Sequence, residues 1–266
     1  MTAAQEGNKT SSGGSIVLLT LASAQFLMAL DSSVMNVSIA TVAKDVGTTV
    51  TGIQVAITLY TLVMAAFMIT GGKIGQILGR KRAFVIGCVI YGCGSGMTAL
   101  APTLAFLIIG WSVLEGLGAA LILPAVVALV ATNFGPSERP RAYGLVISAA
   151  AIAVALGPLI GGLFTTYASW RWVFAGEVLF VLVILGLSRR MADSPARRDV
   201  KLDLVGTLLS AAGLAMIVFG ILRAGTWGFV QPKPDAPQWL GASPVIWLLL
   251  GGAGVLTLFV LWENRR

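Results

Sequence analysis

Eight long apolar stretches, separated by short polar or charged segments, constrain the fold of this chain more than any other feature. A helix that crosses a bilayer needs about 20 mostly apolar residues. The expected spans are 16–42, 51–71, 83–101, 104–132, 143–166, 172–188, 204–223 and 243–262. Charged residues are only 11% of the chain, against about 25% in soluble domains. The pattern predicts an all-α, polytopic membrane protein and excludes a soluble enzyme.

The distribution of positive charge predicts the orientation of these spans. With the N-terminus in the cytoplasm, 14 of the 18 Lys and Arg residues fall in inner segments. Cytoplasmic loops carry such an excess of Lys and Arg. We therefore expect both termini in the cytoplasm. The net charge of +7 then reflects topology and anionic lipid, and no nucleic-acid partner is expected.

A dense run of charges at 189–203 divides the chain into unequal parts. Six predicted spans precede this run and two follow it. We expect four segments: a cytoplasmic N-terminal tail over 1–15, a six-helix bundle over 16–188, a charged cytoplasmic linker over 189–203, and two additional transmembrane helices over 204–266.

Three carboxylates lie within predicted spans: Asp31, Glu115 and, closer to the outer surface, Glu177. Ionisable residues inside a span are costly and mark functional sites by default. No Lys or Arg lies at comparable depth, and a carboxyl group buried without a cation favours its protonated form. Asp31 and Glu115 are therefore candidates for binding and releasing a proton. A hydrogen-bonded structural carboxyl is the alternative for each.

Polar side chains on the first predicted helix favour a water-filled path on that side of the helix, because lipid would not satisfy them. The candidate cavity residues are Gln25, Met35, Asn36, Tyr60, Trp111 and Glu177. A transporter is the natural hypothesis, and a channel or an intramembrane enzyme stays open at this point. The chain has no histidine, which disfavours an intramembrane protease, and no metal site is expected.

Four local motifs follow one another along the first five spans. They are Leu30-Asp31-Ser32-Ser33-Val34-Met35-Asn36-Val37, then Gly72–Arg82, Leu114–Ala120, and Gly157-Pro158 with Gly161-Gly162. Together they resemble motifs of the major facilitator superfamily, most closely those of its drug:proton antiporter branch with fourteen transmembrane helices. The resemblance implies a superfamily-like N-terminal six-helix bundle followed by the two extra helices of that branch.

The resemblance also implies roles for individual residues. Asp31 would carry the proton, whereas Glu115, a candidate by its burial, stands where the family's motif usually has Gln. The motif between helices two and three would form a tight inner turn and couple the helix ends to conformational change, through Gly72, Gly75, Gly79, Arg80, Lys81 and Arg82. The helix-five motif would shape the bend and packing of that helix, through Gly157, Pro158, Gly161 and Gly162.

At three positions an uncharged residue replaces a residue that is usually charged in the family's motifs. Gln76 stands where an acidic residue is usual, and Ile77 where a basic residue is usual. Ser112 stands where the fourth-helix motif usually has an Arg, three residues before Glu115.

The implied function is proton-coupled export of a small amphipathic or cationic compound by alternating access in the plasma (inner) membrane. The proton gradient would supply the energy, with no cofactor and no enzymatic reaction. Superfamily transporters pair two six-helix bundles, so we expect a truncated or half-transporter that works with a second bundle-bearing chain or with itself. Two alternatives stay open: a non-transporting membrane scaffold or remnant that needs a partner chain, and a proton-independent facilitator of a small metabolite.

Overall fold

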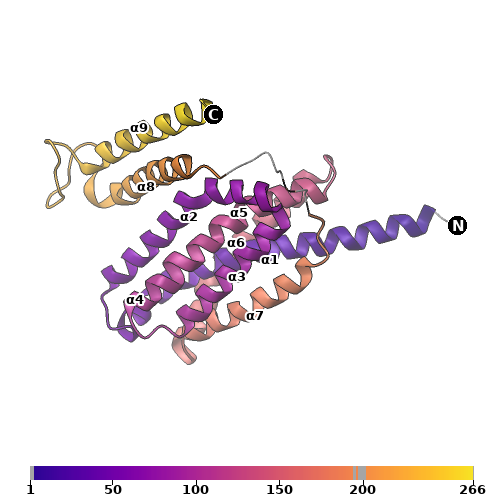
Figure 1. Ribbon diagram of the computed structural model, residues 1–266. Coiled ribbons are helices and arrows are strands. Elements are labelled where there is room, and N and C mark those ends of the chain that lie inside the picture. Colours follow the sequence, from indigo (N-terminus) through magenta and orange to yellow (C-terminus); the bar gives the residue numbers. More distant parts are fainter. Residues whose placement is uncertain (1–2, 194–195, 197–201, 266) are drawn as a thin grey trace.

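The computed structural model describes residues 3–193, 196 and 202–265, and the side chains from residue 14 onward. The regular structure of these residues is helical (Figure 1). The elements are α1 (Ala3–Asp45), α2 (Val50–Leu78), α3 (Arg80–Ala99), α4 (Leu104–Leu107), η1 (Ile108–Glu115), α5 (Gly116–Asn133), α6 (Arg139–Tyr167), α7 (Arg171–Ser188), α8 (Leu204–Trp227) and α9 (Pro244–Asn264). Because α4, η1 and α5 form one span, the described residues contain eight segments that can cross a membrane. This confirms the predicted all-α, eight-span fold.

Several helices extend beyond the predicted spans. The segment 72–82, expected to be a loop, is helical except at Gly79, where α2 ends and α3 begins. Hydropathy detects the apolar length that fits the bilayer, whereas a helix continues into the polar interface as long as its backbone bonds are satisfied. Likewise, α1 begins at Ala3, inside the predicted tail. In the predicted linker 189–203, residues 194–195 and 197–201 lie outside the described residues.

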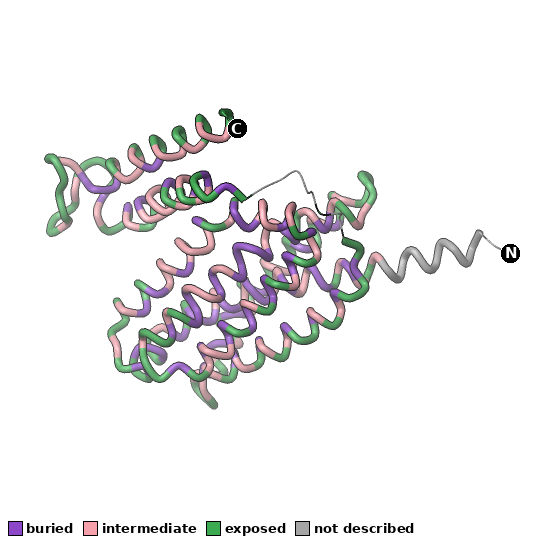
Figure 2. The backbone as a smooth tube through the Cα atoms, viewed as in Figure 1, coloured by how far each residue is buried: buried purple, intermediate pink, exposed green. Residues whose placement is uncertain are grey.

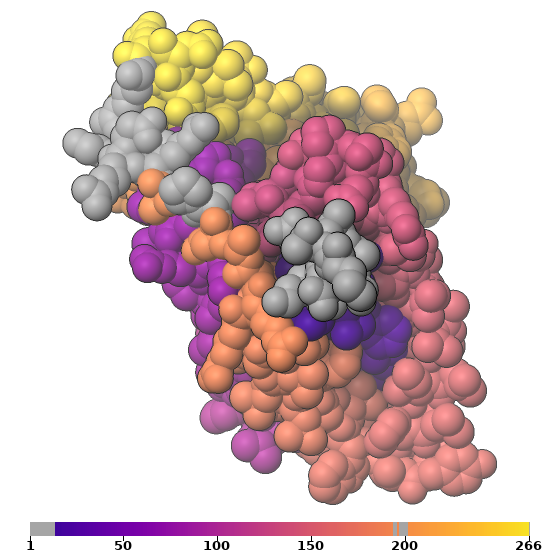
Figure 3. Space-filling view, turned by 90° about the vertical axis from the view of Figure 1, so that its right-hand side faces the viewer, coloured from indigo at the N-terminus to yellow at the C-terminus, as the bar shows by residue number. Residues whose placement is uncertain are grey.

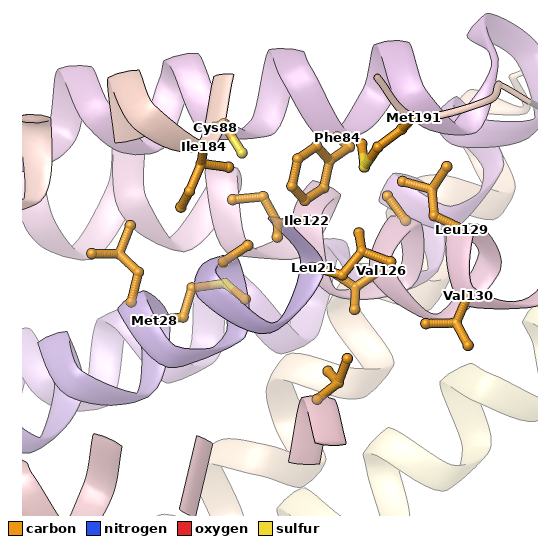
Figure 4. Packing of buried hydrophobic residues seen from close by; sticks show 14 of the residues in the cluster. Leu21, Met28, Phe84, Cys88, Ile122, Val126, Leu129, Val130, Ile184 and Met191 are labelled. Carbon is orange, nitrogen blue, oxygen red and sulfur yellow. The ribbon is translucent and has the colours of Figure 1, made fainter. Parts of the chain in front are cut away.

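Burial is concentrated on α1, α3 and the span formed by α4, η1 and α5 (Figure 2). Figure 4 shows the apolar core at their meeting point, where side chains from α1, α3, α5 and α7 point toward one another. Leu21, Phe84, Ile122 and Ile184 each have at most 2% of their surface exposed. In a bilayer this tight packing, rather than escape from water, holds helices together.

Glycines allow α3 to approach the η1–α5 segment closely. A Cβ atom at Gly118 would lie 2.8 Å from the carbonyl oxygen of Gly87, and one at Gly94 would lie 2.6 Å from Cγ of Glu115. Neither space can hold a side chain without a shift of backbone or neighbours. The helix pair therefore depends on small residues at these positions, as is common in membrane bundles.

The hairpin of α8 and α9 packs at the edge of the bundle (Figures 1 and 3). In this hairpin, α8 lies against α2. The two helices meet closely, since a Cβ atom at Gly252 would lie 2.7 Å from Cγ1 of Ile217. An ion pair between Lys73 of α2 and Glu263 of α9 joins the hairpin to the bundle. Nearby, the Trp262 indole donates a hydrogen bond to Asp203.

We predict that Gly118→Ala destabilises the protein by about 1–3 kcal/mol, because the added methyl group overpacks the contact between α3 and α5. The matched change Gly96→Ala should cost less than about 0.5 kcal/mol, since a Cβ atom there would meet its nearest neighbour at 3.7 Å. Denaturant unfolding in detergent measures both. Equal losses in the two variants would contradict the close-packing argument.

Candidate functional site

The three intramembrane carboxyl groups meet in one place. Asp31 comes from α1, Glu115 from the end of η1 and Glu177 from α7, and one oxygen of each lies within 4.8 Å of the others. Asp31 and Glu115 have no exposed surface, and Glu177 is 3% exposed. Glu177 is thus buried inside the bundle together with the other two acids. We call these three residues the acid cluster.

Few hydrogen bonds support the acid cluster. Trp111 Nε1 donates to both carboxyl oxygens of Asp31, at 2.8 and 3.0 Å. Ser95 Oγ lies 3.1 Å from Oε2 of Glu177. Oε2 of Glu115 and Oε1 of Glu177 are buried and have no hydrogen-bond partner among the described residues. Asp31 is therefore the best-supported member of the cluster, and each glutamate keeps one oxygen available.

Charge repulsion limits how many of these groups can be ionised together. Two negative charges 4.8 Å apart repel by about 3–4 kcal/mol at an effective dielectric constant of about 20. Within the described residues, neither Lys nor Arg forms an ion pair with any of the three. Bound protons, or a cation brought from outside, are the two ways to neutralise such a cluster. The arrangement is chemically suited to exchanging one for the other.

The segment η1 is a π-helix of eight residues, and it positions two side chains of the site. Trp111 lies in its middle and Glu115 at its end. The Trp111 ring stacks on Tyr60 of α2, with centroids 5.0 Å apart and planes 9° from parallel. Ser112, which stands where the family's motif usually has Arg, donates through Oγ to the carbonyl oxygen of Ala56 at 2.8 Å. This hydrogen bond connects η1 with α2. Short π-helical segments often occur at functional sites.

The candidate cavity residues lie in different surroundings. Met35, Tyr60 and Trp111 are buried in an apolar cluster beside Asp31. Gln25 is half-buried, while Asn36 is exposed and donates to the carbonyl oxygen of Ser32 within its own helix. Three large side chains of this set thus fill the space beside the carboxyl group of Asp31. A shared water-filled lining of the six residues stays a prediction.

The motif between α2 and α3 is ordered mainly by backbone contacts. Gly79 is the turn residue and has a positive φ of 98°. Arg80 Nη1 donates to the carbonyl oxygen of Gly72 at 2.9 Å, inside the same motif. Lys81 Nζ donates to the carbonyl oxygen of Met191 at 2.8 Å, and its backbone N–H donates to Asp193 at 2.8 Å. Asp193 thus supplies an acidic group at this helix end, where the motif itself has Gln76.

The remaining motif residues lie at the helix ends and between helices. Gly75 lies in α2 beside Arg80, and Arg82 is exposed at the start of α3. In α6, Gly157 packs against Ser33 of α1 and Gly161 against Val34. Pro158 lies inside α6, which continues to Tyr167 without a break, and Gly162 faces open space. These contacts place the helix-five motif at the interface of α6 with α1.

A six-helix membrane bundle with buried carboxyl groups at its centre defines a polytopic membrane protein of the transporter type. The family model of the Major Facilitator Superfamily matches residues 21–262. The chain belongs to this superfamily.

Among curated relatives, the chain is 34% identical over 251 residues to the puromycin resistance protein pur8 of Streptomyces alboniger, covering 93% of this chain and 47% of that protein. It is 32% identical over 263 residues to the cephamycin export protein CmcT of Amycolatopsis lactamdurans, covering 97% and 51%. For the lincomycin resistance protein of Streptomyces lincolnensis the identity is 30% over 253 residues, covering 94% and 50%. The chain thus spans about half the length of the curated relatives it matches.

Solved structures with a similar fold include a peptide transporter POT in complex with sulfate. That similarity has a TM-score of 0.62 at 16% identity and covers 79% of this chain and 52% of that chain. The POT family transporter PepTSo has a TM-score of 0.58 at 13% identity, covering 96% and 55%. At these identities the comparison shows a shared fold.

We predict that Trp111→Phe destabilises the protein by about 1.5–3 kcal/mol, because Asp31 loses its indole donor while the ring still packs on Tyr60. Trp172→Phe, at a position 64% exposed, should cost at most about 0.5 kcal/mol.

A double-mutant cycle of Trp111→Phe with Asp31→Asn should show a coupling above about 0.5 kcal/mol in the free energy of unfolding. Strictly additive effects of the two substitutions would contradict an energetic link between these side chains.

Proposed function

We propose that this chain forms the N-terminal part of a proton-driven exporter of small amphipathic or cationic compounds. The observation that carries the proposal is the acid cluster, in which Asp31, Glu115 and Glu177 lie together without a Lys or Arg ion pair among the described residues. Membership of a transporter superfamily supports the same function. Transport of this kind needs no cofactor and no enzymatic reaction.

Asp31 and Glu115 are the proposed proton carriers. The two oxygens of Asp31 share the single indole N–H of Trp111, which stabilises the ionised form relative to a buried carboxylate without a donor. Glu115 is buried with one unpartnered oxygen, an arrangement that favours a bound proton. A change in the position of η1 relative to α1 would alter both environments together. Proton uptake on one side of the membrane and release on the other would follow from such a change.

The substrate class is proposed from the relatives and from the charge of the site. Named relatives are a puromycin resistance protein, a cephamycin export protein and a lincomycin resistance protein. We propose that the chain handles small organic compounds of similar size, with a preference for cationic ones because the acid cluster is negative when deprotonated. Superfamily transporters bind substrate between two bundles, so we propose that this bundle works against a second one, supplied by another bundle-bearing chain or by a second copy.

We predict that Asp31→Asn abolishes proton-driven export while membrane insertion is retained. Inverted vesicles that carry the chain are energised with a proton gradient, and uptake of ethidium is measured. The matched control is Asp235→Asn, an exposed loop residue at φ 66°, a conformation that Asn tolerates. Normal gradient-driven uptake by Asp31→Asn would overturn the proton assignment, and absence of uptake by the unchanged chain would overturn transport by this chain alone.

We also propose a plasma (inner) membrane location with both described ends of the chain on the cytoplasmic side. The charge distribution supports this orientation. A membrane-impermeant maleimide should therefore label Lys233→Cys in intact cells, and should label Ser137→Cys only after permeabilisation. Both positions lie in loops and are exposed. The reverse pattern of labelling would refute the orientation.

A further inference from the structure

A lateral crevice opens between α6 and α7, with α1 as its floor. Both helices lie against α1 but have little direct contact with each other. The crevice has a volume of about 220 Å³. This is smaller than the about 300–1,000 Å³ of typical small-molecule sites, so a ligand would fill it only with part of its surface. Phe26 and Leu30, four residues apart on one face of α1, form the floor. Ile160 and Phe164, four residues apart on one face of α6, form one wall. Of the six residues that the sequence suggested as cavity lining, Glu177 lines this crevice and the other five do not.

The α7 wall combines aromatic rings with one acid. Trp172 and Phe180 line the crevice together with Gly176 and Glu177. Trp172 lies near the start of α7 and is 64% exposed, so it marks the mouth. Phe180 packs against Phe26 with ring centroids 6.3 Å apart, which places two aromatic rings together deeper in the crevice. Glu177 lies six residues, or about 9 Å, along α7 from its first residue.

Glu177 is an acid in a crevice that is otherwise lined by apolar side chains, so helix packing alone does not explain it. Its side chain is 97% buried, and its Oε1 has no hydrogen-bond partner among the described residues. Its other oxygen is held by Ser95. A buried carboxyl oxygen without a partner is costly, and a cation beside it would remove that cost. Aromatic faces near the cation would add further attraction.

We propose that this crevice binds a lipophilic cation that enters from the membrane, with its apolar groups among the aromatic rings and its positive centre at Glu177. The acid and the apolar walls occur in the same site, which favours this occupant over a neutral acyl chain. Because Glu177 also belongs to the acid cluster, a cation bound there lies next to Asp31 and Glu115. The inference deepens the proposed export function by giving its substrate a lateral entry site, and it rests on that function for this role only.

Binding of tetraphenylphosphonium to the purified chain in lipid nanodiscs tests the proposal without any proton gradient. We expect saturable binding, at least about tenfold weaker in Glu177→Gln. Glu138→Gln, an exposed acid at the start of α6, should bind as the unchanged chain does. Tetraphenylborate, the anion of the same shape, should not compete.

A second variant tests the crevice itself. Gly176 lines the crevice, and a Cβ atom there meets no atom within 4 Å, so Gly176→Leu can fill the space without straining the backbone. It should weaken binding by at least about tenfold, whereas Gly144→Leu, at an equally open glycine of α6, should not. Thermal unfolding checks that all variants remain folded.

Unchanged binding in both Glu177→Gln and Gly176→Leu would overturn the proposal, as would equal binding of cation and anion, which indicates an apolar or lipid-binding crevice. Absence of gradient-driven uptake by the unchanged chain, together with saturable cation binding, would leave this site standing, so failure of the crevice and failure of the export function give different results.

Discussion

The contact of Trp111 with Asp31 joins the two halves of the six-helix bundle. Asp31 belongs to α1, the first of the six spans, and Trp111 belongs to η1, in the fourth. Stacking of Tyr60 on the same indole adds α2 to this contact. In a bilayer no water is available to replace such a bond, so the packing of the remaining helices has to keep these three side chains in register. The glycines that let α3 approach η1 and α5 also bring Glu115 into close contact with α3.

The three acids of the site are not equivalent, because each has a different hydrogen-bond partner. Asp31 accepts from an indole, Glu177 lies near a serine hydroxyl, and Glu115 has a long 3.4 Å contact with Thr98. Their environments therefore respond differently when helices move. Glu177 in addition borders the lateral crevice. A single residue thus connects the membrane-facing surface of the bundle with its interior.

The sequence was sufficient for the number and approximate positions of the spans, because apolar length is a local property. It also identified Asp31 and Glu115 as buried acids. It could not show that Glu177 joins them, because that depends on the rotation of α7. A local signal did exist, since Glu177 is in phase with Phe174, Val181 and Ile184, all of which the structure buries. The π-helical turn and the pairing of Trp111 with Asp31 depend on contacts between distant segments, which periodicity does not record.

The single-residue connection at Gly79 has a mechanical consequence. With only one residue between α2 and α3, and with Arg80 bonded back to Gly72, neither helix can slide along its axis without the other. The ion pair of Lys73 with Glu263 links the α8–α9 hairpin to α2, and Gly79 links α2 to α3. Because α3 carries Ser95 and Thr98, a continuous series of contacts joins the hairpin to the buried carboxyl groups.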